Sequence, residues 1–215
     1  SMPRSPIRRP AASIDIQPWF RDVDDLPDQL TSQTLFQNER PLEIEVGSGK
    51  GLFLTNASSV NPQSNFVGIE IMAKYAKHAA GKLARTGNRN ALMISGNAEP
   101  LFRDRVLPGS LGGVHVYFPD PWWKSKHRKR RAVNETSVRN FSRALKPGGR
   151  FHFWTDVLDY FELTIEMIAL VAPELGVPIP EEEIAAEHDL DYRTHFERRS
   201  RMHQIPVYRV RYEKS

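Results

Sequence analysis

Apolar residues follow two patterns that alternate along the chain from residue 42 onward. Short apolar runs, typical of buried strands, are each followed by a longer segment in which apolar residues recur every three or four positions, as on one face of a helix. The apolar runs occupy residues 42–46, 65–71, 91–94, 113–118 and 150–154. Strands that alternate with helices predict a parallel sheet with right-handed crossovers and helices on both faces. The pattern therefore predicts an α/β fold.

Two weaker patterns border this alternating region. Residues 205–212 alternate in polarity and predict a half-covered edge strand, while residues 19–40 carry apolar side chains without a clear period and predict a lead-in that packs on the domain. Residues 1–18 combine four prolines with three arginines, a mixture that cannot form a packed core. We expect a flexible basic arm over residues 1–18 and a single domain over residues 19–215.

Composition narrows the classes of function. The chain has 215 residues, enough for one domain with a buried core, and no apolar run approaches the ~20 residues of a membrane helix. There is no cysteine, and the seven histidines show no ligand-like spacing, so we expect neither a disulfide nor a metal site. No apolar segment typical of a secretory signal follows the basic start. The sequence therefore predicts a cytoplasmic protein.

The carboxyl ends of the predicted strands carry the side chains with the clearest chemistry. In a parallel sheet these ends meet at one rim, where ligands of such folds bind. The residues at this rim are Gly47, Gly49, Gly51, Glu70, Asn97, Asp120 and Asp156. Their convergence predicts one ligand site.

The glycine loop and two carboxylates favour a ligand that contains adenosine. The Gly-x-Gly-x-Gly spacing matches neither the dinucleotide fingerprint nor a phosphate P-loop, so it is a weak signal alone. Glu70 can accept both hydroxyls of a ribose, or it can cap a helix. Glu45 can accept from an amino group, which S-adenosylmethionine has and NAD lacks.

Other polar residues have two interpretations each. Asn97, with the backbone amide of Ala98, can contact an adenine edge, or Asn97 can cap the next helix. Asp156 can contact a ligand, but the sequence alone favours a helix cap. His115 and His152 lie inside strands, where histidines are more often core residues than catalysts.

The segment at residues 114–131 combines a strand, an acid, two indoles and a block of cations. Phe118-Pro119-Asp120-Pro121-Trp122 is followed by Trp123 and by eight residues of which six are Lys or Arg. These cations are Lys124, Lys126, Arg128, Lys129, Arg130 and Arg131. Clustered cations pair with phosphates, and the indoles either stack on a base or pack the loop against the sheet. The segment predicts chemistry on a nucleotide.

With these residues in view, the chain resembles the tRNA (guanine-N7-)-methyltransferase family over residues 42–212. The most specific part is Phe118-Pro119-Asp120-Pro121-Trp122 with Lys124 and the basic residues 127–131. Further support comes from Glu45 before the glycine loop, Gly68-Ile69-Glu70, Thr155-Asp156 with Tyr160, and Thr194-His195-Phe196-Glu197-Arg198. Asn97 stands where many bacterial members have Asp, and Trp123 where His is frequent.

The resemblance implies a Rossmann-like class I methyltransferase with a seven-stranded, mostly parallel sheet, S-adenosylmethionine as cofactor and tRNA as substrate. The expected cofactor-binding residues are Glu45, Gly47, Gly49, Gly51, Glu70, Asn97, Ala98 and Asp120, and Asp120 is also the expected catalytic residue. The expected guanosine contacts are Lys124, Asp156, Thr194, His195, Phe196 and Glu197. The expected contacts to the RNA backbone are Lys126, Arg128, Lys129, Arg130 and Arg131.

Two other functions share part of this pattern. An S-adenosylmethionine enzyme acting on a small amine would use the glycine loop and Glu70 but not the cations. A noncatalytic RNA-binding protein of the same fold would keep the cations, although the presence of Glu45, Glu70 and Asp120 argues against loss of the cofactor site. We expect a monomer or homodimer that needs no partner protein.

Overall fold

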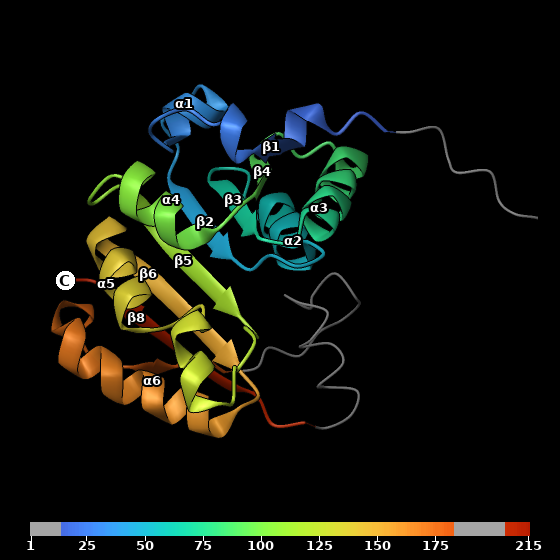
Figure 1. Ribbon diagram of the computed structural model, residues 1–215. Helices are drawn as coiled ribbons and strands as arrows, with labels where there is room; N and C mark the ends of the chain where they lie inside the picture. The colour runs from blue at the N-terminus through green and yellow to red at the C-terminus, as the bar shows by residue number, and fades with distance from the viewer. Residues whose placement is uncertain (1–13, 183–204) are drawn as a thin grey trace, which may run out of the picture.

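One mixed sheet runs through the computed structural model, which describes residues 14–182 and 205–215 (Figure 1). Its strands are β1 (Phe20–Asp22), β2 (Leu42–Val46), β3 (Asn65–Glu70), β4 (Ala91–Ser95), β5 (Leu111–Tyr117), β6 (Leu145–Thr155), β7 (Ile179–Pro180) and β8 (Tyr208–Glu213). Their order across the sheet is β1-β4-β3-β2-β5-β6-β8-β7. Neighbours from β1 to β6 are parallel, whereas β8 is antiparallel to both β6 and β7. The predicted α/β class is confirmed.

Helices cover both faces of the sheet. The α-helices are α1 (Ser32–Phe36), α2 (Leu52–Val60), α3 (Ala73–Thr86), α4 (Ala98–Arg105), α5 (Glu135–Ala144) and α6 (Leu158–Val171). Short 3-10 helices are η1 (Gln17–Trp19), η2 (Val23–Asp25), η3 (Ser125–Arg130) and η4 (Pro173–Leu175). Figure 1 shows α2 beside α3, and α5 beside both α4 and α6. No helix in the described ranges has the length and apolar content needed to cross a membrane.

Among the described residues the sheet has eight strands, one more than the seven expected. The lead-in contributes β1, which pairs in parallel with β4 through Phe20 and Met93. A strand of three residues is too short to show an alternating pattern, so the sequence could not distinguish it from a loop that packs on the domain.

Two buried clusters lie on opposite faces of the sheet, because successive side chains of a strand point to opposite sides. Leu92 and Ile94 of β4 belong to the cluster under α4, α5 and α6, whereas Met93 packs with α3. The buried side of α3 is made of small residues and one leucine, namely Ala76, Ala79, Ala80 and Leu83. Parallel strands covered on both faces explain the continuous apolar runs in the sequence.

The two strand histidines are hydrogen-bonded inside the protein. His115 and His152 stack with ring centroids 4.7 Å apart. The Nε2 atom of His115 lies 2.8 Å from Glu43 Oε1, and the Nδ1 atom of His152 lies 2.6 Å from Glu181 Oε1. Burial opposes ionisation of Glu43, but the hydrogen bond and positive charge of His115 lower its pKa overall. The interpretation of both histidines as core residues is confirmed.

The direction in which successive strands are added to the sheet reverses at β2. The chain proceeds outward from β2 through β3 to β4 and then returns to β5 on the other side of β2. Such a reversal opens a crevice beyond the carboxyl ends of the central strands, where ligands of α/β sheets bind.

Candidate functional site

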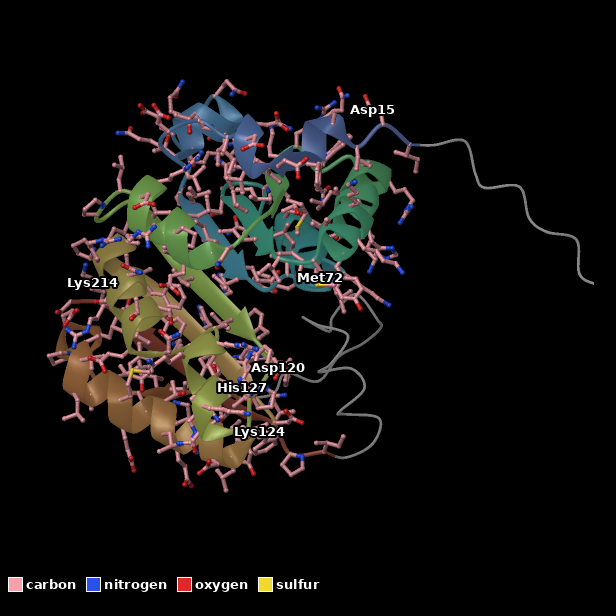
Figure 2. All side chains as sticks on the ribbon, in the orientation of Figure 1. Asp15, Met72, Asp120, Lys124, His127 and Lys214 are labelled. Atoms are coloured by element: carbon pink, nitrogen blue, oxygen red, sulfur yellow. The ribbon has the colours of Figure 1, made fainter. Side chains whose placement is uncertain are left out.

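A cavity of about 840 Å³ lies at this reversal, a size typical of small-molecule sites. Predicted site residues in its walls are Gly47, Gly49, Glu70, Asn97, Ala98, Asp120, Lys129, Arg130 and Arg131. Figure 2 labels two residues that line it, Met72 on the β3 side and Asp120 on the β5 side. The structure therefore brings most of the predicted rim together around one space.

The glycine loop performs two tasks. Gly49 has a φ of +54°, and a side chain there would meet no atom within 4 Å, so the backbone is open to a ligand. Gly51 has a φ of +80°, and an added Cβ would lie 2.5 Å from the Cβ of Ala79. Gly51 does not line the cavity, and its contact with Ala79 shows that it allows the start of α2 to pack against α3. A contact between Gly51 and a cofactor stays a prediction.

Glu70 holds the glycine loop. Its side chain is buried, with Oε1 accepting from the backbone N–H of Gly49 at 2.9 Å and Oε2 accepting from that of Met72 at 2.8 Å. Each carboxylate oxygen has a second lone pair, and Glu70 lines the cavity, so further acceptor capacity faces a ligand. The carboxylate connects the loop after β2 to the turn before α3.

Glu45 is a buried acid with an unsatisfied oxygen. It is 3% exposed, and among the described residues its Oε1 atom has no hydrogen-bond partner. Burial raises the pKa of Glu45 to about 8; a hydrogen bond from Ser48 opposes this rise, and the charge of Glu70 adds to it. Glu45 lies beside the cavity-lining residues Val46 and Gly47 rather than in the wall itself. A cationic donor is the natural partner for such a carboxylate.

Asn97 caps α4 and also lines the cavity. Its Oδ1 atom accepts from the backbone N–H of Glu99 at 3.2 Å, which confirms the capping interpretation. The Nδ2 donor of Asn97 and the backbone N–H of Ala98 are not used by this cap, and both residues line the cavity. Contact with an adenine edge stays a prediction.

The loop after β5 is strained and held in place. Phe118 and Trp122 have φ values of +51° and +43°, which are uncommon for residues other than glycine and cost on the order of 1–3 kcal/mol each. The N–H of Trp122 donates to Oδ1 of Asp120 at 3.0 Å. These constraints direct Asp120 toward the cavity.

Arg131 differs from its prediction as an RNA contact. It is 7% exposed, its Nε donates to the Pro121 carbonyl at 2.6 Å, and its guanidinium lies 4.2 Å from the centroid of the Tyr160 ring. The Tyr160 hydroxyl in turn accepts from the backbone N–H of Val133 at 3.1 Å. Burial leaves Arg131 little surface for RNA backbone, and its contacts fasten the Asp120 loop; a contact between Arg131 and RNA stays a prediction.

The other cations of the run are exposed around η3. They are Lys124, Lys126, Arg128, Lys129 and Arg130. The Arg130 guanidinium lies 5.3 Å from the centroid of the Trp122 ring, and Lys129 and Arg130 line the cavity. Lys124 does not line the cavity. Trp122 thus packs within the loop, whereas Trp123 is 64% exposed.

Predictions at the remaining rim positions have different outcomes. Asp156 is half-buried and does not line the described cavity. The hydroxyl of Thr155, rather than Asp156, accepts from the backbone N–H of Val157 at 3.1 Å before α6, so the predicted cap by Asp156 was wrong. Residues Thr194, His195, Phe196 and Glu197 lie outside the described residues, and their guanosine contacts stay predictions.

The sequence did not single out an apolar part of the wall. Ile71, Met72 and Tyr75 line the cavity and are 68%, 54% and 41% exposed. Large apolar side chains left open beside a cavity suit the face of a flat ring. Their position directly after Glu70 could have indicated this role. The sequence pattern instead assigned them to the end of a strand and the start of a helix.

A family model described as "Putative methyltransferase" matches residues 39–210. A Rhodopirellula baltica protein named tRNA (guanine-N(7)-)-methyltransferase is 58% identical over an alignment that covers 99% of this chain and 80% of that protein. A Francisella philomiragia protein of the same name is 35% identical, with 62% of this chain and 58% of that protein covered.

Solved structures share the fold at low identity. The 16S rRNA methyltransferase KamB has a TM-score of 0.61 at 18% identity, and the aminoglycoside resistance methyltransferase NpmB1 has a TM-score of 0.57 at 22% identity. Each alignment covers 87% of this chain and 95% of the other. The expected Rossmann-like methyltransferase fold is confirmed.

Proposed function

This chain belongs to the tRNA (guanine-N(7)-)-methyltransferase family, and we propose that it transfers a methyl group from S-adenosylmethionine to N7 of a variable-loop guanosine in tRNA. The observation that carries this proposal is the composition of one cavity. Glu70 and the glycine loop form its β3 side, Asp120 stands on its β5 side, and Lys129 and Arg130 complete it. Glu70 and the glycine loop suit the cofactor, whereas Asp120, Lys129 and Arg130 suit a nucleotide.

The described residues fit S-adenosylmethionine. The unpartnered oxygen of Glu45 matches its α-amino group, and the carboxylate of Glu70 matches the ribose hydroxyls. The Nδ2 atom of Asn97 and the backbone N–H of Ala98 remain for the adenine edge. When bound, S-adenosylmethionine supplies a methyl group on a positively charged sulfur, and this sulfur leaves as a neutral thioether with the electron pair of the broken bond.

Asp120 stabilises charge rather than removing a proton. Guanine N7 carries an in-plane lone pair and no hydrogen, so its attack on the methyl carbon needs no general base. We assign the Asp120 carboxylate to the N1–H and N2–H donors of guanine, where it offsets the positive charge that methylation places on the ring. Its cavity position and its hydrogen bond from Trp122 favour it over Asp156, the other acid considered.

The RNA side of the cavity orients the substrate. Lys129 and Arg130 approach phosphates next to the guanosine, and Lys126 and Arg128 extend the same exposed surface. Trp122, backed by Arg130, offers a ring to an unstacked base. Lys124, Asp156 and residues 194–197 stay proposed guanosine contacts.

A small amine is a poor substrate for this cavity. Lys129 and Arg130 in its wall repel a cationic amine, whereas they attract a nucleotide. A purely RNA-binding role leaves the buried carboxylate of Glu45 without a function and with an unsatisfied oxygen. We further propose that the protein acts in the cytoplasm, as a monomer or homodimer and without a partner protein.

A labelling experiment tests the proposal. The protein is incubated with methyl-labelled S-adenosylmethionine and either bulk tRNA or a panel of small amines, and the product is located by nuclease digestion of the RNA. We expect label in 7-methylguanosine from tRNA. Label in an amine would favour the small-molecule enzyme, and absence of both transfer and cofactor binding would favour the binding protein.

A further inference from the structure

A second basic surface lies apart from residues 124–131. The chain has no acidic residue between Glu70 and Glu99, and this stretch includes all of α3. Lys74, His78, Lys82 and Arg85 follow one another at spacings of four, four and three residues, which places them along one face of the helix. At a rise of 1.5 Å per residue, these four residues, here called the α3 stripe, span roughly 17 Å.

Three of the four residues of the α3 stripe, Lys74, Lys82 and Arg85, carry like charge at neutral pH. The pKa of Lys82 is lowered by burial and then by the charges of Lys50 and Arg85. Burial and the charges of Lys82, Lys50 and Arg85 likewise lower the pKa of His78. Within residues 14–182 and 205–215, Lys50, Lys74, His78 and Arg85 form no ion pair. Such mutual repulsion suits an external polyanion.

The α3 stripe begins beside the cavity. Met72 and Tyr75, at the start of α3, line the cavity. Lys129 and Arg130 of η3 line it from the loop that follows β5. Since α3 connects the carboxyl end of β3 to the amino end of β4, the stripe runs from the cavity back along the sheet (Figure 1). The cavity therefore has exposed cations on both its η3 side and its α3 side.

We propose that the α3 stripe is a second phosphate-binding surface for the tRNA substrate, separate from the η3 cations. This inference rests on the proposed function, since it assumes that a guanosine of tRNA enters the cavity. An RNA strand that delivers one nucleotide to the cavity continues on both sides of it. The η3 cations hold one side of the backbone, and the α3 stripe holds the other.

An anionic membrane is a weaker match for the same charges. A helix that binds a membrane surface inserts its apolar face. In α3 that face, formed by Ala76, Ala79, Ala80 and Leu83, is buried against the sheet. The stripe can therefore offer charge to a partner but no apolar face. Charge is what the phosphates of a polynucleotide require.

The chain supplies a charge-matched control. Lys77 is an exposed residue of the same helix, but its Nζ lies 5.9 Å from the centroid of the Phe20 ring. Arg89 is also exposed, and its guanidinium lies 4.6 Å from the centroid of the Trp19 ring. Both cations thus lie against the lead-in rather than in the α3 stripe.

The test compares Lys74→Gln/Arg85→Gln with Lys77→Gln/Arg89→Gln in the full chain. The Kd for bulk tRNA is measured over a range of KCl concentrations, with S-adenosylhomocysteine affinity and thermal melting as checks on the cavity and the fold. We expect the stripe variant to bind tRNA about tenfold more weakly, with a salt slope smaller by roughly 1.5. The control variant keeps both values, and both variants keep their affinity for S-adenosylhomocysteine.

Each other outcome has a definite meaning. Equal losses in the two variants, or no loss in either, would overturn the proposal, because position on α3 would then not matter. Unchanged tRNA binding with lost binding to phosphatidylglycerol vesicles would assign the stripe to a membrane instead. If the unmodified chain binds tRNA through the stripe but methylates no guanosine, the proposed function fails and the stripe stands. If the stripe variant methylates tRNA with an unchanged KM for tRNA, the stripe proposal fails and the proposed function stands.

Discussion

The two sides of the cavity hold their charges differently. On the β2–β3 side, Glu45 and Glu70 are 3% and 7% exposed, and Glu70 is fixed by two backbone hydrogen bonds. On the β5 side, Lys129 and Arg130 are exposed on a short 3-10 helix. Buried carboxylates act through direct contacts that salt hardly screens, whereas exposed cations act through attraction that salt weakens. Variants of the two sides should therefore be distinguishable by their salt dependence.

The largest effect is expected at Asp120, between the two sides. Asp120→Asn keeps the Oδ1 acceptor for the Trp122 N–H but removes the charge that offsets methylation of the ring. We expect kcat to fall about 100-fold, as when one group that stabilises transition-state charge is lost, with little change in S-adenosylhomocysteine affinity. Single-turnover methylation of tRNA measures this. Asp28→Asn, at an exposed acid in the lead-in, is the control, and an unchanged rate in Asp120→Asn would refute the charge argument.

Glu70→Gln tests the buried side directly. In this variant the amide nitrogen replaces one carboxylate oxygen and faces the backbone N–H of either Gly49 or Met72. The nitrogen cannot accept a hydrogen bond from that N–H. We expect S-adenosylhomocysteine to bind on the order of 30-fold more weakly, at all salt concentrations, because one loop bond and one ribose contact are lost at about 1–1.5 kcal/mol each. Calorimetric titration measures the affinity.

The matched control is Glu39→Gln, which changes an exposed acid outside the cavity. Affinity for tRNA in the absence of cofactor should stay the same in both variants. If Glu70→Gln weakened tRNA binding in a salt-dependent way, the proposed division between the two sides would fail.

The sequence predicted the buried side better than the exposed side. The position of Glu70 follows from strand order alone, because parallel strands bring their carboxyl ends to one rim whatever the details of packing. Asp120 follows for the same reason. Glu70 lies at the end of one apolar run and Asp120 two residues beyond another, and such runs are the strongest pattern in the sequence.

Residues whose roles depend on long-range contacts could not be assigned from the sequence. Nothing in the run of cations distinguishes Arg131 from Arg130; only the path of the loop brings Arg131 to Pro121 and Tyr160. Gly51 likewise looks like the other loop glycines until Ala79 of α3 is placed beside it. Thr155 and Asp156 both suit the same backbone N–H, and local geometry gives it to Thr155.

Arg131 therefore provides a test within the basic run. Arg131→Gln removes the hydrogen bond to the Pro121 carbonyl and the contact with the Tyr160 ring. We expect kcat to fall about tenfold because Asp120 is less well positioned, and the free energy of unfolding to fall by about 1–3 kcal/mol. The salt slope of tRNA binding should not change. A flatter slope with an unchanged kcat would return Arg131 to the group of phosphate contacts.

The pH dependence of cofactor binding examines Glu45. Burial raises the pKa of Glu45 to about 8, so the acid is mostly protonated at pH 7 until a cationic amino group favours its charged form. Binding then releases a proton, and affinity for S-adenosylhomocysteine should rise by up to about tenfold per unit from pH 6.5 to 8 and then level off. Calorimetry in buffers of different ionisation enthalpy measures the released proton.

Glu45→Gln should abolish both the proton release and the rise with pH. A pH-independent affinity in the unmodified protein would contradict the assignment of Glu45 to the amino group. The sign for folding is also fixed: since the folded protein holds this proton more tightly than the unfolded chain, Glu45 makes the free energy of unfolding fall as pH rises toward 8.

The smallest effect is expected on the exposed side, at Lys126 and Arg128. Both are exposed on η3 and neither lines the cavity, so Lys126→Gln/Arg128→Gln removes two charges without altering its walls. We expect tRNA to bind about fivefold more weakly at moderate salt, with a salt slope smaller by roughly 1 to 1.5, and kcat at saturating tRNA to stay the same. Filter binding at several KCl concentrations measures the slope, and Arg103→Gln/Arg139→Gln on α4 and α5 is the charge-matched control. Because a solvated cation acts mainly on encounter and affinity, a loss of kcat in the η3 variant with an unchanged slope would mean that these side chains position the loop, as Arg131 does.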